Sequence, residues 1–315
     1  MATVSRRKLA VGLPVYNGEN YLETTLRAIL AQTFEDFELI ICDNASTDST
    51  PEIVARVTGD DPRVRYIRHP RNLGAAPNYN SVYQSAEPSV YFCWLAHDDL
   101  PTPRYLEACV EALDSHPETV LAFTHTFRLD SQGKTHGQFP NRPNLRSDDP
   151  SIRFSDVIHQ RASTHPLFGV MRREAVDRTR LHGSYAGSDR TFLAEMALIG
   201  PWIEVPEPLF HIRDHPGRYT RAKTRRDGLR TQNAWFDTAN AGRITLPRWR
   251  RLGAYVTAVA RADLRPEEKV RAYRRLGAWI TDRNWKVLLR SLAVATAQLV
   301  SRMRRRLFAS SNSDS

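Results

Sequence analysis

The feature that most restricts the fold is a regular alternation of short apolar runs with helical patterns through the first 126 residues. Short apolar runs are typical of buried strands, and apolar residues three or four apart predict amphipathic helices. Alternating strands and helices form a mostly parallel sheet covered on both faces, so we expect an α/β fold. The expected strands are 9–15, 37–42, 64–67, 90–95 and 120–126, and the expected helices are 19–32, 51–57, 75–84 and 103–117.

Polar clusters follow three of these strands, at residues 14–17, 43–46 and 97–99. The carboxyl ends of parallel strands meet at one edge of a sheet, and ligands bind there. The chain has neither a G-x-G-x-x-G nor a G-x-x-x-x-G-K-[ST] pattern, so a dinucleotide fingerprint and a P-loop are both excluded. The three clusters therefore form one candidate site.

Two adjacent carboxylates, Asp98 and Asp99, stand at the end of the fourth strand in "CWLAHDDLPTP". One interpretation is a helix start, because aspartates cap helices and suit their first turn. The other is a divalent cation, because hard cations prefer carboxylate oxygens.

The second part of the chain is less regular. Residues 127–163 are polar and predict a long excursion, and residues 165–176 return to a strand and a helix. A further helix is expected over 187–200, with Phe192, Met196 and Ile199 on one face, followed by an extended segment broken by prolines. We expect residues 1–126 and 127–217 to be two halves of one domain, and residues 218–315 to be a basic helical region.

Charge separates the C-terminal region from the rest. The first 215 residues hold 22 Lys/Arg against 28 Asp/Glu, whereas the last 100 hold 23 against 7. Residues 284–308 combine a helical apolar face with many basic residues, which fits a helix lying on an anionic membrane surface. Packing on its own domain or on a second subunit explains the same pattern, so a homo-oligomer stays open.

Other sequence features bear on location and partners. No apolar stretch reaches the length of about 20 residues that spans a bilayer, and no leader pattern precedes the first strand, so a cytoplasmic protein is expected. The cysteines, Cys42, Cys93 and Cys109, show no metal-ligand spacing and are expected to be reduced and buried. No familiar nucleic-acid module is present, so nucleic acid is not an expected partner.

Several motifs in a fixed order resemble the family-2 glycosyltransferases with a GT-A fold. They are "VGLPVYNGENYLETTLRAILAQT", "FELIICDNASTDST", "RNLGAAPNYN", "HDD", "SDRTFLAEMALIGPW" and "RDHPG", and they cover about residues 9–217. The resemblance implies transfer of a sugar from a nucleotide-sugar to an acceptor hydroxyl with inversion, assisted by Mg²⁺ or Mn²⁺ as a Lewis acid. A hexose or deoxyhexose on UDP or dTDP is the favoured donor, and a glycan or lipid-linked acceptor of the cell envelope would fit a membrane-surface enzyme.

The resemblance also implies metal ligands. Asp98, Asp99 and His215 would hold the cation, with His211 as a competing candidate and a plain surface loop as the alternative for both histidines. The family pattern often has an aspartate where Ala96 stands, and His97 would face the nucleotide.

Nucleotide contacts are implied around the first two strand ends. Pro14, Val15 and Tyr16 would line the base pocket, and Asp43 would accept a hydrogen bond from the base, although an Asx turn or helix cap is a local alternative. Glu19 would brace this loop or simply favour the helix dipole. Asn72 and Gly74 would let the backbone approach the nucleotide, with Asn78 a weaker candidate and a plain turn as the alternative.

Asp189 matches the acid that takes the acceptor proton as general base in the resemblance, with Ser188 where a glutamate is usual. A helix N-cap is the alternative for either residue. Two other functions are compatible with parts of the sequence. One is a nucleotidyltransferase, although the first strand is not followed by a glycine-rich basic loop, and the other is a non-catalytic basic binding protein.

Overall fold

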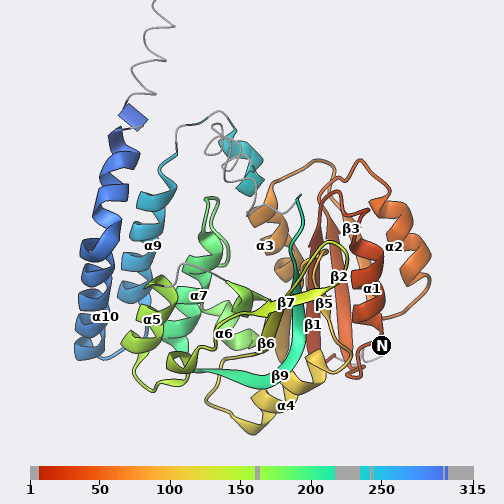
Figure 1. Ribbon diagram of the computed structural model, residues 1–315, viewed down its shortest axis with the longest axis horizontal. Helices are drawn as coiled ribbons and strands as arrows, with labels where there is room; N and C mark the ends of the chain where they lie inside the picture. The colour runs from red at the N-terminus through yellow and green to blue at the C-terminus, as the bar shows by residue number, and fades with distance from the viewer. Residues whose placement is uncertain are drawn as a thin grey trace, which may run out of the picture.

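In the computed structural model (Figure 1), residues 7–159, 164–216, 235–241, 243, 245–293 and 295–296 are described, and they form a mixed sheet covered by helices. The strands are β1 (Leu9–Val15), β2 (Phe37–Asp43), β3 (Val64–Arg68), β4 (Tyr91–Trp94), β5 (Leu100–Pro101), β6 (Leu121–Leu129), β7 (Thr135–Gln138), β8 (Val170–Arg172) and β9 (Trp202–Arg213). The α-helices are α1 (Leu22–Leu30), α2 (Thr50–Thr58), α3 (Ala75–Ser85), α4 (Tyr105–Ser115), α5 (Pro150–His159), α6 (Arg173–Asp177), α7 (Ser188–Ile199), α9 (Pro247–Arg261) and α10 (Pro266–Trp279).

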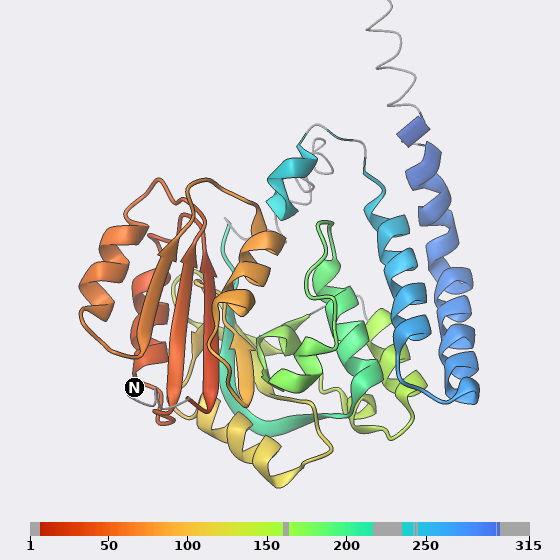
Figure 2. The ribbon, with the colours of Figure 1, turned by 180° about the vertical axis from the view of Figure 1, so that it is seen from behind.

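The sheet has a parallel half and a mixed half. Its strand order in the described residues is β3-β2-β1-β4-β8-β6-β9-β5, with β7 paired to β6. Strands β1 to β4 pair in parallel, as the sequence predicts, whereas β8 runs antiparallel to both β4 and β6. Both β1 and β4 are buried along their whole length, which explains their continuous apolar character. The four parallel strands therefore end at one edge, the top of Figure 2.

The polar excursion expected at 127–163 is wrong in part. Strand β6 continues to Leu129 and turns into β7, a short 3₁₀ turn follows at Pro143–Arg146, and α5 is a regular helix. Helix α5 escapes the sequence pattern because few of its residues are apolar, yet Phe154, Val157 and Ile158 are all buried. They pack between α7 and α10.

Helix α7 begins and ends where expected, before Gly200, but it is not amphipathic. All its residues from Thr191 to Leu198 are buried, because α5 and α9 cover the side that the pattern left to solvent. Prolines in β9 do not break it into separate pieces. They shift its register against β6 near His125, so that the strand bulges and then continues.

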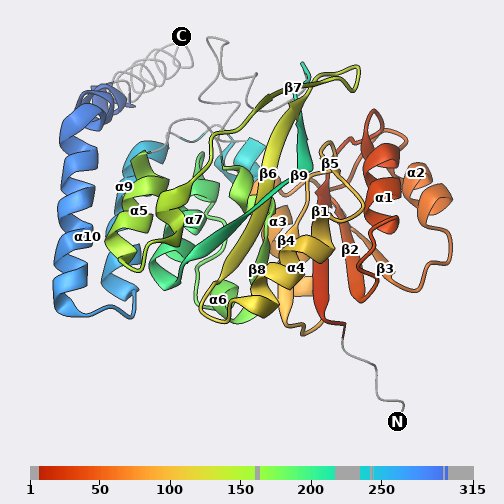
Figure 3. The same cartoon turned by 60° about the horizontal axis from the view of Figure 1, so that its bottom comes forward.

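The C-terminal region adds a helical hairpin to the domain. Helices α9 and α10 pack beside α7 and α5 (Figure 3), and Tyr255, Val259 and Leu276 are buried in that contact. A π-turn at Ile280–Asn284 leads into further helix over 285–293. The start of the expected basic region, at 218–228, and the end of its apolar face, at 297–308, lie outside the described residues. None of the described helices has the length and apolar character that crossing a membrane requires.

The three cysteines are free and buried, as predicted. Cys93 lies in the parallel half of the sheet and Cys109 on α4 beneath it, and burial raises the pKa of both thiols. Their role is packing.

Candidate functional site

The loops after β1 and β2 are joined into one unit. The Asn17 backbone N–H donates to Ser46 Oγ at 2.9 Å, and the Thr47 N–H donates to Asn17 Oδ1 at 2.9 Å. The Gly18 N–H donates to Thr50 Oγ1 at 2.8 Å, which ties the loop to the start of α2. Asn17 adopts a positive φ of 51°, a conformation that asparagine tolerates better than most residues. The first two polar clusters therefore form a single surface.

The residues predicted to line the base pocket lie on this unit. Pro14 and Val15 are buried at the end of β1, opposite Cys42 and Asp43 in register, whereas Tyr16 is 41% exposed. Glu19 braces the loop, because its N–H donates to Asp48 Oδ2 at 3.0 Å and its carboxylate accepts from the Ser49 N–H.

The Asp43 carboxylate is fully buried at the end of β2. Its Oδ1 accepts from the Ser46 N–H at 2.9 Å, a local bond to the backbone three residues on, one residue further than in an Asx turn. Its Oδ2 accepts from Tyr66 Oη at 2.6 Å and lies 3.4 Å from Arg68 Nε. Burial and the bond to Asp43 raise the pKa of Tyr66. Asp43 thus organises its surroundings whether or not it also contacts a base.

Asn72 and Gly74 belong to a loop that is held by an asparagine missing from the sequence-predicted set. Asn44 Oδ1 accepts from the Leu73 N–H at 2.8 Å, and Asn44 Nδ2 donates to Asn72 Oδ1 and to the Gly74 carbonyl at 3.1 Å each. Asn78, the weaker candidate, points inward and donates to the Cys42 carbonyl at 3.0 Å. The sequence signal for Asn44 is its position directly after a buried strand.

Asp98 meets His215 at the end of β4. His215 Nε2 lies 2.9 Å from Asp98 Oδ2, and both residues are about 9% exposed. The pairing depends on β9, since Arg213 Nε donates to the Asp98 carbonyl at 3.1 Å and the His215 ring packs 4.6 Å from Tyr21. Two residues more than 110 positions apart in the sequence therefore place a carboxylate oxygen next to an imidazole nitrogen.

Asp99 lies beside this pair but is turned toward β9. Its Oδ1 accepts from the Arg213 backbone N–H at 3.0 Å, and Thr25 on α1 donates to the carbonyls of His97 and Asp99. His97 packs against the loop after β1, next to Gly18. His211, the competing candidate, lies beside Phe127 instead, and burial lowers its pKa.

The donor types at this end of β4 suit a hard divalent cation, because they are carboxylate oxygen and imidazole nitrogen. Among the residues that the structure describes, however, no three His, Cys, Asp or Glu side chains are already arranged as a metal-binding group. The Asp98–His215 pair is the part of the predicted ligand set that is in direct contact.

Asp189 lies in the first turn of α7. Thr164 Oγ1 donates to its Oδ2 at 2.9 Å. Gly187 occupies the N-cap position with φ of 86°, so neither Ser188 nor Asp189 is the N-cap residue, although Asp189 Oδ1 accepts from the Arg190 N–H at 2.8 Å within the first turn. Ser188 is buried, and its hydroxyl lacks a hydrogen-bond partner within the described part of the chain.

His182 connects the two sides of the site and was not predicted. Its ring stacks on Phe192 of α7 at 5.3 Å and meets the edge of Trp94, the last residue of β4, at 5.2 Å. Burial lowers the pKa of His182 to about 4, and the charge of Asp189 acts against that shift. Trp94 precedes Asp98 by four residues and Phe192 follows Asp189 by three. This cluster therefore places the acidic strand end and the start of α7 on the same side of the molecule (Figure 2).

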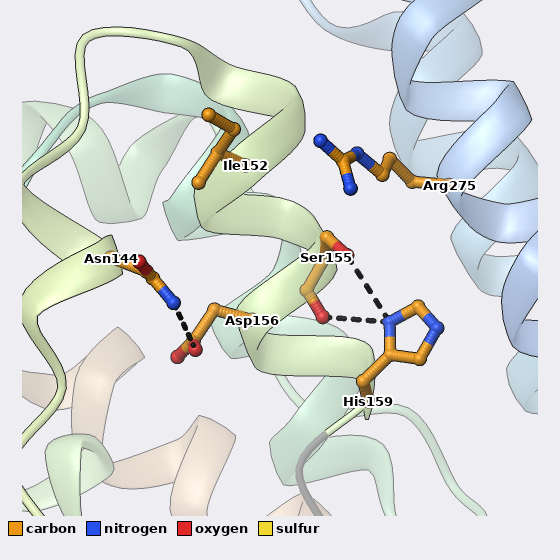
Figure 4. A pocket seen from close by; sticks show the side chains of 6 residues that line it. All are labelled: Asn144, Ile152, Ser155, Asp156, His159 and Arg275. Atoms are coloured by element: carbon orange, nitrogen blue, oxygen red, sulfur yellow. Dashed lines mark hydrogen bonds between the residues drawn. The ribbon is translucent and has the colours of Figure 1, made fainter.

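A separate cavity of about 310 Å³ lies between α5 and α10 (Figure 4). Arg275 reaches into it from α10, opposite Ser155 and His159 of α5. The remaining lining residues are Asn144, Ile152 and Asp156, and none of the sequence-predicted site residues is among them. This cavity belongs to the contact between the hairpin and the domain, and it contributes nothing to the edge where the strands end.

Comparison with solved structures identifies the fold. TarS residues 1–349 from S. aureus in complex with UDP-GlcNAc align with a TM-score of 0.63 and 16% identity, over 88% of this chain and 74% of that one. The mannosyltransferase PcManGT from Pyrobaculum calidifontis, in complex with GDP-Man and Mn²⁺, aligns with a TM-score of 0.51 and 18% identity, over 96% and 81%. Both likenesses show the GT-A fold that the sequence predicts.

Sequence comparison gives the family. An uncharacterized glycosyltransferase of Rickettsia typhi is 31% identical over 148 residues, or 47% of this chain and 44% of the relative. The chondroitin synthase of Pasteurella multocida is 34% identical over 125 residues, or 40% and 13%. The chain thus spans less than half the length of these curated relatives. The family model "Glycosyl transferase family 2" matches residues 10–179, more than half of the sequence. The chain belongs to glycosyl transferase family 2.

Proposed function

We propose that this protein transfers a hexose or deoxyhexose from a nucleotide diphosphate sugar to an acceptor hydroxyl, with inversion at the anomeric carbon. The observation that carries the proposal is that a cluster of rings links the segment after β4 to the start of α7, two places that each carry an acidic group. Asp98 follows β4 and contacts His215, Asp189 lies in the first turn of α7, and the rings of Trp94, His182 and Phe192 pack between them. The UDP-GlcNAc bound by TarS supports a uridine donor, and the GDP-Man bound by PcManGT makes GDP-sugars the second candidate.

Donor binding is assigned to the joined loops after β1 and β2. Pro14, Val15 and Tyr16 would flank the base, Asp43 would accept from it, and Glu19 would keep the loop in place. The loop that Asn44 holds, with Asn72 and Gly74, would approach the nucleotide through its backbone. His97, next to Gly18, would face the same ligand. These roles suit UDP or dTDP, whose base has an imide N–H to offer.

A Mg²⁺ or Mn²⁺ ion would be held by Asp98, Asp99 and His215. Such an ion neutralises the charge that develops on the leaving diphosphate. Asp98 and His215 are both close to nine-tenths buried, so their interaction with charge is weakly screened by water. The chain has Ala96 in place of a further acid, so the site has one carboxylate fewer than the family pattern.

Asp189 is the proposed general base. It would take the acceptor hydroxyl proton while that oxygen attacks the anomeric carbon and the bond to the diphosphate oxygen breaks. Thr164 Oγ1 donates to its Oδ2 at 2.9 Å and so orients the carboxylate. A positioned base contributes typically ~10²–10⁴-fold in rate.

A donor screen with Mn²⁺ or Mg²⁺ tests the proposal by measuring released nucleoside diphosphate. We expect Asp98→Ala and Asp99→Ala to weaken metal-dependent donor binding by tenfold or more, because each removes a charge from the site. Asp189→Asn should leave donor binding within about twofold and lower turnover ~10²–10⁴-fold. His211→Ala, at the histidine that faces Phe127, is the matched control and should change neither quantity.

Other products would contradict the assignment. Release of pyrophosphate would favour a nucleotidyltransferase. Steeply salt-dependent binding of RNA without any binding of nucleotide-sugars would favour a basic binding protein. Full turnover by Asp189→Asn would remove that residue from the chemistry.

We further propose a glycan or lipid-linked acceptor at an anionic membrane surface, as on the cytoplasmic face of an envelope membrane. Support comes from Trp285, Leu289 and Leu292, which are 46%, 55% and 37% exposed on the last described helix. Lys286 and Arg290 are exposed beside them. An apolar strip flanked by basic residues suits anionic lipid better than a neutral surface.

A further inference from the structure

A short segment of the C-terminal region, residues 235–241, lies against the proposed donor loop although it falls beyond the family match at 10–179. The Thr238 N–H donates to the Leu73 carbonyl at 3.2 Å, and Thr238 Oγ1 donates to the Asn72 carbonyl at 3.0 Å. We call residues 235–241 the strap. It contacts the same loop that Asn44 holds from the side of the sheet.

The contact at Gly74 is close enough to exclude a side chain. A Cβ on Gly74 would lie 2.5 Å from Asp237 Cα, and Gly74 has φ of 94°. Backbone therefore packs on backbone, with Phe236 only 8% exposed beside it. Glycine is therefore required at position 74 of "RNLGAAPNYN" because a segment remote in the sequence packs directly against its backbone.

The other end of the strap reaches the loop before α7. Asn240 is 7% exposed, and its Nδ2 donates to the Ser184 carbonyl at 2.9 Å. Ser184 lies five residues before Asp189, and no regular element separates them. Figure 2 shows the strap between the N-terminal end of α3 and this loop.

We propose that the strap couples the donor loop at 72–74 to the loop at 183–187, which makes Thr238 and Asn240 positioning residues for sugar transfer. The path consists of three hydrogen bonds, from Asn44 to Asn72, from Thr238 to Asn72, and from Asn240 to Ser184. The inference rests on the proposed function, because it assigns the coupled loops to donor and acceptor sides. This coupling requires the strap to move as one rigid unit. The strap meets this requirement because the Ala239 N–H donates to Asp237 Oδ1 at 2.9 Å, a capping bond that makes it a tight turn.

The consequence for kinetics follows from which loop each residue holds. Thr238→Val removes the bond to Asn72 and should raise the donor KM about fivefold, with Thr238→Ser restoring it. Asn240→Ala removes the bond to Ser184 and should lower kcat about fivefold. Because releasing either end frees the whole strap, each single variant should also change the other parameter to a smaller extent, and the double variant should lower kcat/KM by less than the product of the single effects. Thr257→Val, at an exposed threonine that bonds only within α9, is the control.

Amide hydrogen exchange of the full chain gives a readout that does not depend on activity. Without ligand, either single variant should speed exchange in both loops, 72–78 and 181–187, while the midpoint of thermal unfolding stays within about 2 °C. Each variant speeding exchange only in the loop that it touches, or fully multiplicative kinetic effects, would overturn the coupling.

Adding UDP with MnCl₂ then separates the two proposals. In the wild type, protection from exchange should appear at residues 14–19 and 72–78 and extend to 181–187. In Asn240→Ala, protection at 14–19 and 72–78 should remain, whereas protection at 181–187 should be lost. Absence of protection with UDP, dTDP and GDP would contradict the proposed function, yet the exchange result without ligand would still decide the coupling.

Discussion

At the scale of single residues, two buried histidines dominate the electrostatics near the site. Burial lowers the pKa of His182 to about 4 and that of His165 to about 3, so both rings are neutral at pH 7. Asp189 partly opposes the shift at His182, whereas Arg142 and Arg128 add to the shift at His165. Both rings pack on aromatic neighbours, His182 on Phe192 and His165 on Phe139.

These pKa values predict a loss of stability in mild acid. In the unfolded chain a histidine binds its proton near pH 6.5, whereas the folded protein resists protonation of His182 down to about pH 4. Between these values the unfolded state binds more protons, so stability is complete above pH 6.5 and falls as the pH falls. Each histidine contributes at most about 1.4 kcal/mol per pH unit in this window. Urea unfolding at several pH values between 4.5 and 7.5 measures the slope.

His182→Phe isolates one of the two contributions. Phenylalanine keeps the packing on Phe192 and Trp94 but cannot bind a proton. The slope of the unfolding free energy against pH should therefore decrease by up to about 1.4 kcal/mol per pH unit, the contribution of one proton. His136→Gln, at an exposed histidine, should leave the slope unchanged. An unaltered slope in His182→Phe would show that this ring is not held neutral by burial.

At the scale of elements, the parallel half of the sheet is set by close packing of α3 on β1. Gly12 lies in the middle of β1, and a Cβ there would overlap Val82 Cγ1 of α3. The glycine lets the helix approach the strand, which positions the N-terminal end of α3 and the loop at 72–74 above it. Gly253 in α9 is the opposite case, because nothing lies within 4 Å of a Cβ built there.

Alanine at these two glycines should therefore act in opposite directions. Gly12→Ala is expected to destabilise the protein by about 1–3 kcal/mol, because α3 must move or Val82 must change rotamer. Gly253→Ala should stabilise it by up to about 1 kcal/mol, the difference in helix propensity. Thermal and urea unfolding check both, and a neutral Gly12→Ala would mean that α3 is free to shift outward.

At the scale of the whole molecule, the C-terminal hairpin covers the domain, and the helix that follows it carries an exposed apolar strip. Arg180 shows how firmly it is attached, since its guanidinium pairs with Glu195 of α7 and donates to the Ala254 carbonyl of α9 at 3.0 Å. Trp249 Nε1 also donates to the Leu288 carbonyl, which fastens the last described helix to the start of α9. The side chains of Trp285, Leu289 and Leu292 point away from this contact.

The membrane proposal is tested on that strip. Replacing Trp285, Leu289 and Leu292 together with serine should lower co-sedimentation with vesicles containing anionic phosphatidylglycerol by tenfold or more. Val90→Ser, at an apolar residue that is 54% exposed on the sheet, should have no effect. Equal binding by the triple variant, or by a chain lacking residues 284–315, would remove the membrane from the proposal. A concentration-dependent dimer that the triple variant abolishes would assign the strip to a second copy instead.

The α/β class and most elements of the first half could be predicted from local sequence pattern. Continuous apolar runs such as 9–15 can be satisfied only by burial on both faces, and the helical spacings between them leave few other arrangements. The pattern also indicated His97, Asp98 and Asp99 as one edge group, because they directly follow a strand. Local pattern sufficed there because each element is buried in a regular way.

The way in which remote segments meet could be learned from the folded protein alone. The bond between His215 and Asp98, the packing of Asp237 on Gly74, and the cluster of His182 with Trp94 and Phe192 join residues from different parts of the chain. Helix α5 was missed, and α7 was expected to have a solvent face, because what covers a helix is a property of its neighbours. Periodicity records which side chains are apolar, whereas the neighbours that bury a polar one are fixed when distant strands and helices pack together.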